Sequence, residues 1–339
     1  MMRTVEELEN FMTKPSSQLI NDIKSLDGDI LILGVGGKMG PTLAILAKRA
    51  INEANINKKV IGVSRFSSKK EREKLDANGV ETVAADLLDD KALNALPDVK
   101  NVIFMAGNKF GTAGNEHFTW IMNTYLPGRV AKRFKNSNIV AFSSGNVYPL
   151  TNIVSENCSE DTPVGPIGEY AQSCLGRERI LTNFSHNNDT KMLLFRLNYA
   201  IDMRYGVLLE IAQHVYNEQP IDLSMGSVNV IWQGDANEYA IRSLLHCESP
   251  PKTLNVTGPE TLSVRWLANQ IAVRMGKKAY FMKEEQPSAL LNNASEAHEL
   301  FGYPNVSLKH MIDMTTKWLM NKGEVSDKPT HFQERKGNF

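Results

Sequence analysis

The sequence predicts an α/β protein with a doubly wound parallel sheet and a smaller C-terminal α/β lobe. Short apolar segments alternate with amphipathic helical segments through residues 29–198, the order in which parallel strands and their covering helices follow one another. A glycine-rich loop stands between the first apolar segment and the first long helix, as it does in sheets that bind dinucleotides. The expected fold class is therefore Rossmann-type, with a second lobe after the sheet.

The predicted strands are short and almost continuously apolar, because strands covered by helices on both faces have no polar side. Helical segments such as 41–54 and 118–134 fill the gaps between them. The predicted strands are 29–34, 59–64, 80–86, 101–107, 138–144 and 191–198, with a further one at 254–258.

The rhythm of the pattern changes after residue 198, and this change sets the predicted domain organisation. The predicted units are an N-terminal helical extension (1–27), a Rossmann domain (28–198 with 228–247), a substrate lobe (199–227 and 248–325) and a polar tail (326–339). The tail reads "SDKPTHFQERKGNF" and is too polar to pack by itself.

Composition and charge restrict the class of partner. The chain has 38 Lys and Arg against 38 Asp and Glu, so its formal net charge is zero. A neutral chain has no broad electrostatic footprint for nucleic acid or an anionic membrane, which leaves a small molecule as the expected partner. No apolar run approaches the ~20 residues that span a bilayer. The N-terminus mixes charges with apolar residues, unlike a signal peptide, and this predicts a cytoplasmic protein.

Neither a disulfide framework nor a metal site is expected. Cys158, Cys174 and Cys247 are widely spaced, with no CxxC pattern and no histidine at a ligand spacing. The histidines are scattered along the chain without the spacing of metal ligands. We therefore expect reduced, buried thiols.

The glycine-rich loop reads "LILGVGGKMGPTLA" and predicts a pyrophosphate site. Glycines at these positions let backbone N–H groups approach a pyrophosphate at the N-terminus of the following helix. A tight turn without a ligand is the alternative. The predicted contacts are Gly34, Gly36, Gly37, Lys38, Met39 and Gly40.

The end of the second predicted strand bears on the choice between NAD and NADP. A carboxylate there would bond the adenosine ribose of NAD, but the segment reads "VSRFSSKK". Ser64 and Arg65 can hold a 2′-phosphate instead, with Lys69 and Lys70 adding positive potential, so the sequence favours NADP and leaves NAD possible. The alternative is that Arg65 stacks on the adenine or faces solvent. Further predicted cofactor contacts are Asp86, Leu87, Ala106 and Gly107.

These motifs resemble those of the extended short-chain dehydrogenases, also called NAD-dependent epimerase/dehydratases. The resemblance covers residues 28–280 and includes the glycine loop, "AADL", "FMAG", "WIMNTYLPG", "FSSGNVYP", "EYAQSC", "FRLNYAIDMRYG" and "LNVTGPETLS". It implies a Rossmann domain with a smaller C-terminal substrate lobe. Many members of this family act on nucleotide-activated sugars.

The resemblance also implies roles for individual residues. Ser144 would bond the substrate oxygen, and Tyr170 would be the acid/base. Asn123 would be a structural and proton-relay amide, and Asn198 would lie near the nicotinamide or the substrate. The family reaction is hydride transfer to or from the nicotinamide, coupled to proton transfer by the tyrosine.

One position in "EYAQSC" departs from the family pattern. A phenol has a pKa near ~10 and needs a nearby cation to ionise at neutral pH, which the family supplies with a lysine four residues after the tyrosine. Here that residue is Cys174, which is neutral although it lies on the same helix face as Tyr170. We expect Lys109, after the fourth predicted strand, to replace the lysine. The alternatives are an exposed loop lysine, a packing role for Tyr170 and a nucleophilic Cys174.

The second lobe gives fewer signals about the substrate. Asn146, Arg204 and Trp232 lie in segments that border the substrate in the family, and Tyr205 follows Arg204. Arg204 can clamp a phosphate or carboxylate with two parallel hydrogen bonds. A structural turn at Arg204 and a core position for Trp232 fit the sequence equally well.

The leading interpretation is an NAD(P)-dependent oxidoreductase or epimerase that acts on a sugar, nucleotide sugar or sugar-derived acid. The competing hypothesis is a non-catalytic dinucleotide-binding or sensor protein that has lost the catalytic lysine. A lyase or isomerase that uses the cofactor only structurally or transiently is the third. The expected partner is a small carbohydrate-type molecule, and the family implies a possible homodimer through the helices at 115–135 and 169–187.

Overall fold

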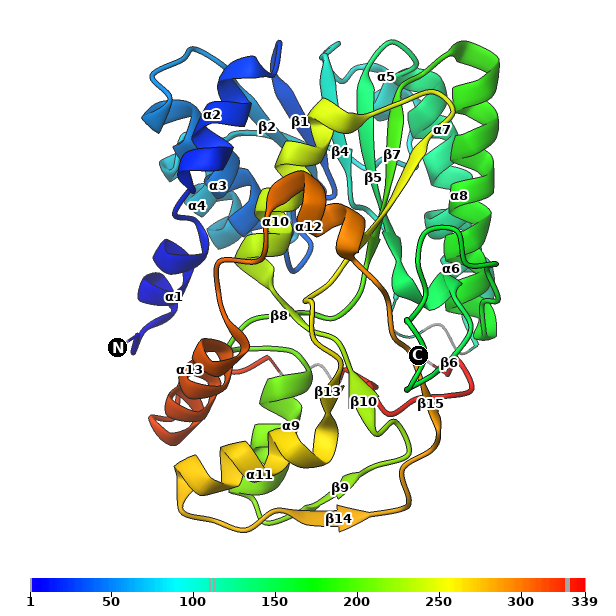
Figure 1. Ribbon diagram of the computed structural model, residues 1–339. Helices are drawn as coiled ribbons and strands as arrows, with labels where there is room; N and C mark the ends of the chain where they lie inside the picture. The colour runs from blue at the N-terminus through cyan, green and yellow to red at the C-terminus, as the bar shows by residue number, and fades with distance from the viewer. Residues whose placement is uncertain (1, 110, 112–113, 327–329, 339) are drawn as a thin grey trace.

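The computed structural model describes residues 2–109, 111, 114–326 and 330–338. A seven-stranded sheet with helices on both faces stands above a smaller lobe (Figure 1). All neighbouring strands of the sheet are parallel, which confirms the predicted fold class. The strand order is β12 (Lys252–Val256), β7 (Met192–Leu197), β5 (Asn138–Ser144), β4 (Asn101–Phe104), β1 (Ile30–Leu33), β2 (Val60–Ser64) and β3 (Glu81–Ala84).

The strand order reverses beside β1. The chain runs from β1 to β2 and β3 on one side, then returns to place β4 on the other side. In doubly wound sheets, ligands bind outside the carboxyl ends of the strands at this reversal. The central strands β1 and β4 are buried along their whole length, whereas β3 at the edge is partly exposed, so apolar sequence marks the centre of the sheet.

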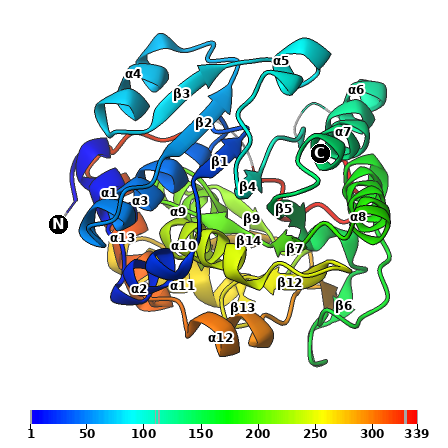
Figure 2. The ribbon, with the colours of Figure 1, turned by 90° about the horizontal axis from the view of Figure 1, so that it is seen from above.

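Helices form one layer on each face of the sheet (Figure 2). Apolar side chains of α2, α3, α10 and α12 share one core with the sheet, and those of α5, α7 and α8 share the core on the opposite face. The helices of these layers are α2 (Ser17–Ser25), α3 (Gly40–Glu53), α4 (Lys69–Ala77), α5 (Asp90–Asn94), α6 (Glu116–Trp120), α7 (Leu126–Arg133), α8 (Gly168–Asn188), α10 (Gln233–Arg242) and α12 (Ser295–Phe301), with a π-helical turn at Ile121–Tyr125 between α6 and α7.

The second lobe has a core of its own, built around three helices. They are α9 (Val207–Tyr216), α11 (Val264–Met275) and α13 (Leu308–Met320). Short strand pairs surround them: β9 (Pro220–Asp222) with β14 (Tyr280–Met282), β10 (Ser227–Val228) with β13 (Leu262–Ser263), β11 (Ile231–Trp232) with β8 (Ala200–Ile201), and β15 (Ser288–Ala289) with β6 (Thr151–Asn152). Within the described part of the chain, no helix combines the length and apolar character needed to cross a bilayer.

The structure differs from the predicted domain boundaries in three places. The segment assigned to the substrate lobe at 248–325 contains β12, which is the outermost strand of the main sheet beside β7. The N-terminal extension is not a separate unit, because α1 (Val5–Met12) packs into the second core while α2 packs into the sheet core. The polar tail buries Phe332 in the second core, a long-range contact that its composition does not reveal.

Candidate active site

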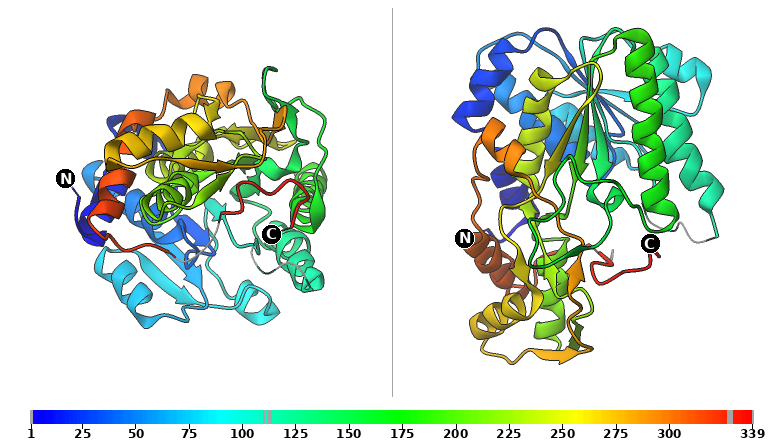
Figure 3. Two further views of the ribbon diagram at one scale, coloured as in Figure 1. Left: turned by 90° about the horizontal axis from the view of Figure 1, so that it is seen from below. Right: turned by 45° about the vertical axis from the view of Figure 1, so that its right-hand side comes forward.

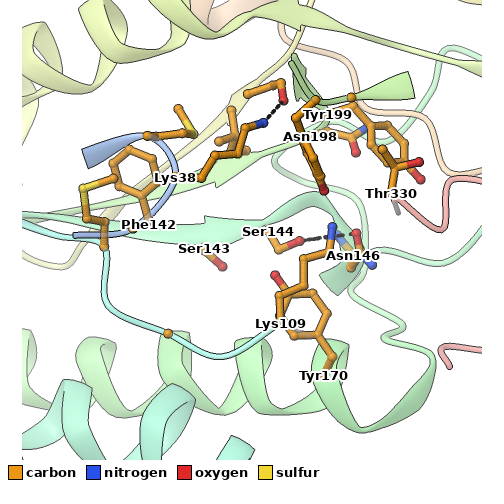
Figure 4. Close-up of a pocket in the computed structure, with 18 of the residues that line it drawn as sticks. Lys38, Lys109, Phe142, Ser143, Ser144, Asn146, Tyr170, Asn198, Tyr199 and Thr330 are labelled. Carbon is orange, nitrogen blue, oxygen red and sulfur yellow. Dashed lines mark hydrogen bonds between the residues drawn. The ribbon is translucent and has the colours of Figure 1, made fainter. Parts of the chain in front are cut away.

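A cavity of about 260 Å³ opens at the carboxyl ends of β1, β4, β5 and β7, against the second lobe (Figure 4). It therefore lies at the reversal of strand order, where the topology predicts a ligand. Residues predicted for the cofactor, for catalysis and for the substrate meet around it. Those that line it are Gly37, Lys38, Met39, Gly107, Lys109, Asn123, Ser144, Asn146, Tyr170 and Asn198.

The glycine loop leads from β1 into α3 and is shaped by two close approaches. Gly34 has φ +91°, and a Cβ there would lie 2.7 Å from the backbone N of Ala106. A Cβ on Gly36 would lie 2.5 Å from Ser64 Oγ. Glycine is needed at Gly34, a side chain at Gly36 would displace the Ser64 hydroxyl, and the missing side chains leave backbone exposed beside the end of β2.

The first turn of α3 is suited to bind a pyrophosphate. Met39 is the N-cap residue and makes no capping hydrogen bond through its side chain, and proline stands in the first turn. Backbone N–H groups at the start of a helix have no partner within the helix and carry partial positive charge, so they attract phosphate. The open loop and the uncapped helix therefore fit the dinucleotide that the sequence predicts.

A carboxylate approaches this loop from α4. Glu71 Oε2 lies 3.3 Å from the point where a Cβ on Gly36 would stand. Ser64, the last residue of β2, lies next to the same point. Burial raises the pKa of the Glu71 carboxyl, and the charge of Lys74 opposes the shift. Arg65 is exposed and does not line the cavity. The acid missing from the end of β2 in the sequence thus has a counterpart seven residues later.

Tyr170 and Ser144 lie together at the cavity wall (Figure 4). Tyr170 stands in the first turn of α8, and Ser144 ends β5, where its hydroxyl accepts a hydrogen bond from Asn146 N at 3.1 Å. Burial raises the pKa of the Tyr170 phenol well above its ordinary value, and the neighbouring Cys174 adds to the shift, whereas a hydrogen bond with Ser144 lowers the pKa. Tyr170 is therefore protonated at neutral pH unless a cation supports its ionised form.

Cys174 is buried beside Tyr170 in a small apolar cluster with Val147, Tyr148 and Cys158. Burial raises the pKa of the Cys174 thiol, with a smaller opposing effect from the charge of Arg177. A neutral buried thiol is a poor nucleophile and cannot replace a cation.

Lys109 reaches this wall from the loop after β4. Its Nζ lies 5.9 Å from the centre of the Tyr170 ring, and both side chains are drawn against one another in Figure 4. Lys109 is half-buried, and loss of hydration lowers the pKa of its ammonium to about 8. A lysine cation thus stands beside the phenol, although it comes from another segment than the sequence pattern of the family provides.

Asn123 holds the loop that carries Lys109. Its Oδ1 accepts a hydrogen bond from Asn108 N at 2.8 Å, and its Nδ2 donates to Asn108 O at 2.8 Å. The same Nδ2 donates to Ser173 Oγ at 3.0 Å, on α8. This buried amide therefore ties the loop to the helix of Tyr170, and its contacts are those of a structural residue.

Arg177 is a buried cation at the cavity that the sequence reasoning did not identify. Its Nε donates to Asn123 O at 3.1 Å and its Nη2 donates to Asn123 Oδ1 at 3.0 Å, while Nη1 donates to Phe142 O. It follows Tyr170 by two helical turns, so a helical-face analysis of "EYAQSCLGRER" is the signal that would have indicated it. Arg177 fixes Asn123 and the end of β5 in place.

A buried ion pair between β7 and α8 fixes the same region. Arg196 on β7 and Glu178 on α8 make two hydrogen bonds, with Nη2 to Oε2 at 2.7 Å and Nε to Oε1 at 2.9 Å. Ser143 Oγ donates to Glu178 Oε1 at 2.5 Å. Both charges are compensated, so the pair fixes the position of α8 relative to the ends of β5 and β7.

Two predicted substrate contacts lie away from the cavity, which corrects that expectation. Arg204 hydrogen-bonds Asp202 Oδ2 and Glu9 Oε1, each at 3.0 Å, so its guanidinium is already occupied by carboxylates. Trp232 is buried in the second core, with its ring centre 5.8 Å from that of Phe11. The structural turn and the core position, given as alternatives, are the arrangements observed.

The other predicted cofactor residues lie at the same edge of the sheet but outside the cavity wall. Asp86 is exposed, and its Oδ1 accepts a hydrogen bond from Leu88 N at 2.9 Å, while Leu87 is buried in the core. Ala106 packs against Gly34. Across the described ranges of the chain, no group of three His, Cys, Asp or Glu side chains is placed to hold a metal ion.

A model of the NAD dependent epimerase/dehydratase family matches residues 30–201, which is more than half of the chain. The chain belongs to this family. The match includes the glycine loop, β5 and α8, and so covers most of the residues that line the cavity, whereas Tyr205, Gly206, Val207 and Thr330 lie outside it. No curated protein matches the chain.

Solved structures of similar fold come from several bacteria. Pal from Bacillus thuringiensis has a TM-score of 0.71 at 16% identity, over 87% of this chain and 99% of that chain. UDP-glucose 4-epimerase from Thermus thermophilus, in complex with NAD, has a TM-score of 0.69 at 17% identity, over 88% of this chain and 100% of that chain. The dTDP-glucose 4,6-dehydratase from Bacillus anthracis, also with NAD, has a TM-score of 0.71 at 14% identity, over 87% and 97%. These likenesses support the fold.

Proposed function

We propose that this protein is an NAD-dependent oxidoreductase or epimerase that oxidises a hydroxyl-bearing carbon of a sugar, nucleotide sugar or sugar-derived acid. The observation that carries the proposal is the position of the Lys109 ammonium, 5.9 Å from the centre of the Tyr170 ring at the wall of the cavity. A serine, a tyrosine and a lysine are thus gathered at one site although the lysine is absent from α8. When bound, NAD would accept the hydride that leaves the substrate carbon.

In this reaction, side chains of the protein would accept and stabilise the proton that leaves the substrate hydroxyl. Tyr170 Oη would take the hydroxyl proton of the substrate, and the Lys109 charge would lower the pKa of the phenol toward the working pH. Ser144 Oγ would hold the substrate oxygen against Tyr170. Asn123 would act as a positioning residue, because it fixes the backbone of Asn108 next to Lys109.

We propose NAD rather than NADP as the cofactor. The family is NAD-dependent, and several structures of similar fold contain NAD, so the NADP preference inferred from Arg65 is not supported. The Glu71 carboxylate at the glycine loop can accept hydrogen bonds from ribose hydroxyls. It would repel the 2′-phosphate of NADP, because two negative charges would share one partly buried site.

The variant Glu71→Gln is expected to weaken NADH binding about tenfold, because hydrogen bonds to charged groups contribute about 1.5–3 kcal/mol. NADPH binding should be unchanged or tighter, since the repulsion is removed. The measurement is a titration of each reduced cofactor by nicotinamide fluorescence. Glu73→Gln is the matched control, because Glu73 lies on the exposed side of the same helix in an ion pair with Lys69. An unchanged ratio of the two dissociation constants would refute the assignment.

A non-catalytic dinucleotide-binding protein is the second candidate. The observation in its favour is Cys174, a buried neutral residue at the position where the family has its lysine. The two candidates differ in the conversion of free sugars, sugar acids and nucleotide sugars in the presence of NAD, followed at 340 nm for net oxidation and by analysis of the sugar product for epimerisation, which leaves NAD unchanged overall. An enzyme gives turnover that depends on Tyr170, whereas a sensor binds the cofactor and gives none.

A further inference from the structure

The described end of the tail, residues 330–338, runs between the second lobe and the start of α8 (Figure 3). Thr330 lines the cavity, and its backbone N donates to Glu210 Oε2 on α9 at 3.0 Å. Phe332 is buried, and its carbonyl oxygen accepts a hydrogen bond from Tyr199 Oη at 3.5 Å. Tyr199 itself lines the cavity, so the tail forms and supports this wall.

The tip of the tail continues to the helix that carries Tyr170. Arg335 Nη1 donates to Ser288 O at 2.6 Å and to Ser224 O at 3.0 Å, both in the second lobe. Gly337 then packs on the start of α8, where a Cβ on Gly337 would lie 2.3 Å from Ile167 O. The tail therefore connects the second lobe with the N-terminus of α8, three residues before Tyr170, and crosses the cleft between them.

The space inside this wall is small, and its side toward the second lobe and the tail presents neutral hydrogen-bonding groups, whereas Lys38, Lys109 and Arg177 line the side of the glycine loop and α8. A volume of about 260 Å³ is below the roughly 300–1,000 Å³ of sites for drug-sized ligands, and the nicotinamide would share it with the substrate. Asn146, Tyr199, Tyr205 and Thr330 face it. Asn198, which is 2% exposed, lines it with an Nδ2 that has no hydrogen-bond partner among the described residues. A buried amide N–H needs an acceptor, and a water or a ligand oxygen would supply it at this point.

The arginines on this side are not available to a diphosphate. Arg204 is bound to Asp202 and Glu9, and Arg335 is bound to the backbone of the second lobe. Lys38 belongs to the glycine loop, where its Nζ donates to Ala200 O at 3.2 Å and lies 3.6 Å from the centre of the Tyr205 ring. A nucleotide-linked sugar would bring two phosphate charges to a wall that offers hydroxyl and amide groups.

We propose that the C-terminal tail forms one wall of the substrate site and that the site takes a compact, polyhydroxylated molecule without a nucleotide, a free sugar or its acid. This inference rests on the proposed function and narrows its substrate class. Hydroxyls of such a molecule would bond Asn198 Nδ2 and Asn146, on the cavity side opposite the glycine loop. The tail would exclude water and larger ligands from the nicotinamide.

The first test measures how far the tail shields bound NADH. Acrylamide quenching of nicotinamide fluorescence is recorded for the wild type, Arg335→Ala and Gly337→Val, with Lys336→Ala as control because Lys336 is an exposed residue of the same segment. Gly337 has φ +78° and no room for a side chain, so valine at this position would displace the end of the tail from the start of α8. We expect quenching to rise several-fold in both tail variants and to stay at the wild-type value in the control. Unchanged quenching in both tail variants would overturn the inference.

The second test uses UDP-glucose and D-gluconate as probes on NADH-loaded wild type. We expect isothermal titration calorimetry to show no saturable binding of UDP-glucose at concentrations up to about 1 mM. A dissociation constant of about 1 mM corresponds to a binding free energy near −4 kcal/mol. D-gluconate and a panel of free sugars are tested in the same way. We expect at least one of them to bind beside the nicotinamide and to lower the acrylamide quenching of NADH fluorescence. Micromolar binding of UDP-glucose would refute the substrate class and leave the proposed function standing, whereas failure to bind NADH at all would refute the proposed function itself.

Discussion

Replacing Tyr170 with phenylalanine is expected to lower the rate of NAD reduction about 10³-fold, within the 10²–10⁴ range of general acid/base catalysis. In the proposed reaction the ionised form of the Tyr170 phenol, beside Ser144 and Lys109, accepts the substrate proton, and phenylalanine keeps the ring but removes this oxygen. The measurement is turnover of a substrate that the wild type accepts, at 340 nm for a net oxidation or by product analysis for an epimerisation. NADH binding should change less than about twofold, because only the reacting oxygen is lost.

Tyr303→Phe is the matched control for this variant. Tyr303 is 74% exposed on the second lobe, so loss of its hydroxyl should leave turnover unchanged. Wild-type turnover by Tyr170→Phe would contradict the assignment of Tyr170 as acid/base and would leave the buried phenol as a packing residue.

Replacing Lys109 with alanine is expected to lower turnover about 10²-fold. The Lys109 ammonium lies 5.9 Å from the centre of the Tyr170 ring. Two unit charges at a separation of about 6 Å interact by roughly 3 kcal/mol at an effective dielectric constant near 20, which is about two powers of ten in rate. The pKa of Lys109 is lowered to about 8, so its charge is present below that pH and is lost as the pH rises through it. The wild-type rate should therefore fall above pH 8, in contrast to the rise that ionisation of a phenol alone would give.

Lys109→Arg tests whether loss of the Lys109 charge causes the fall in rate above pH 8, because an arginine stays charged over the whole pH range of the assay. It should retain part of the activity and lose the fall above pH 8. Lys132→Ala, on the exposed face of α7, is the control for removal of a lysine charge. An unchanged rate in Lys109→Ala would show that the lysine missing from α8 is not replaced from this loop.

Local pattern was sufficient to predict the sheet and the position of the cavity. Buried parallel strands such as β1 and β4 are apolar on both faces, and the glycine loop must follow the first of them. Ser144 ends β5, Lys109 follows β4 and Tyr170 stands in the first turn of α8, all at the same edge of the sheet, so the topology brings them together once the strands are known. This is why a lysine far from Tyr170 in sequence was a reasonable candidate.

Long-range contacts account for what the sequence did not reveal. Glu71 comes to the glycine loop through the path of α4, and Arg177 reaches the cavity from the second turn beyond Tyr170. The tail is polar in composition, yet Phe332 is buried by a lobe that is distant in sequence. The family resemblance places Arg204 at a ligand, but its guanidinium is bound by Asp202 and by Glu9, and Glu9 lies on a helix far upstream that no local pattern connects to it.

A titration of the wild-type protein, freed of any copurified nucleotide, with NADH and NADPH tests the central claim most directly. The glycine loop, the uncapped start of α3 and Glu71 together predict saturable binding of one NADH per chain, with enhanced nicotinamide fluorescence and weaker binding of NADPH. That result would establish the cofactor site beside Tyr170 and Lys109. Absence of binding by both cofactors would contradict the account, because neither hydride transfer nor a dinucleotide-sensing role is possible without it.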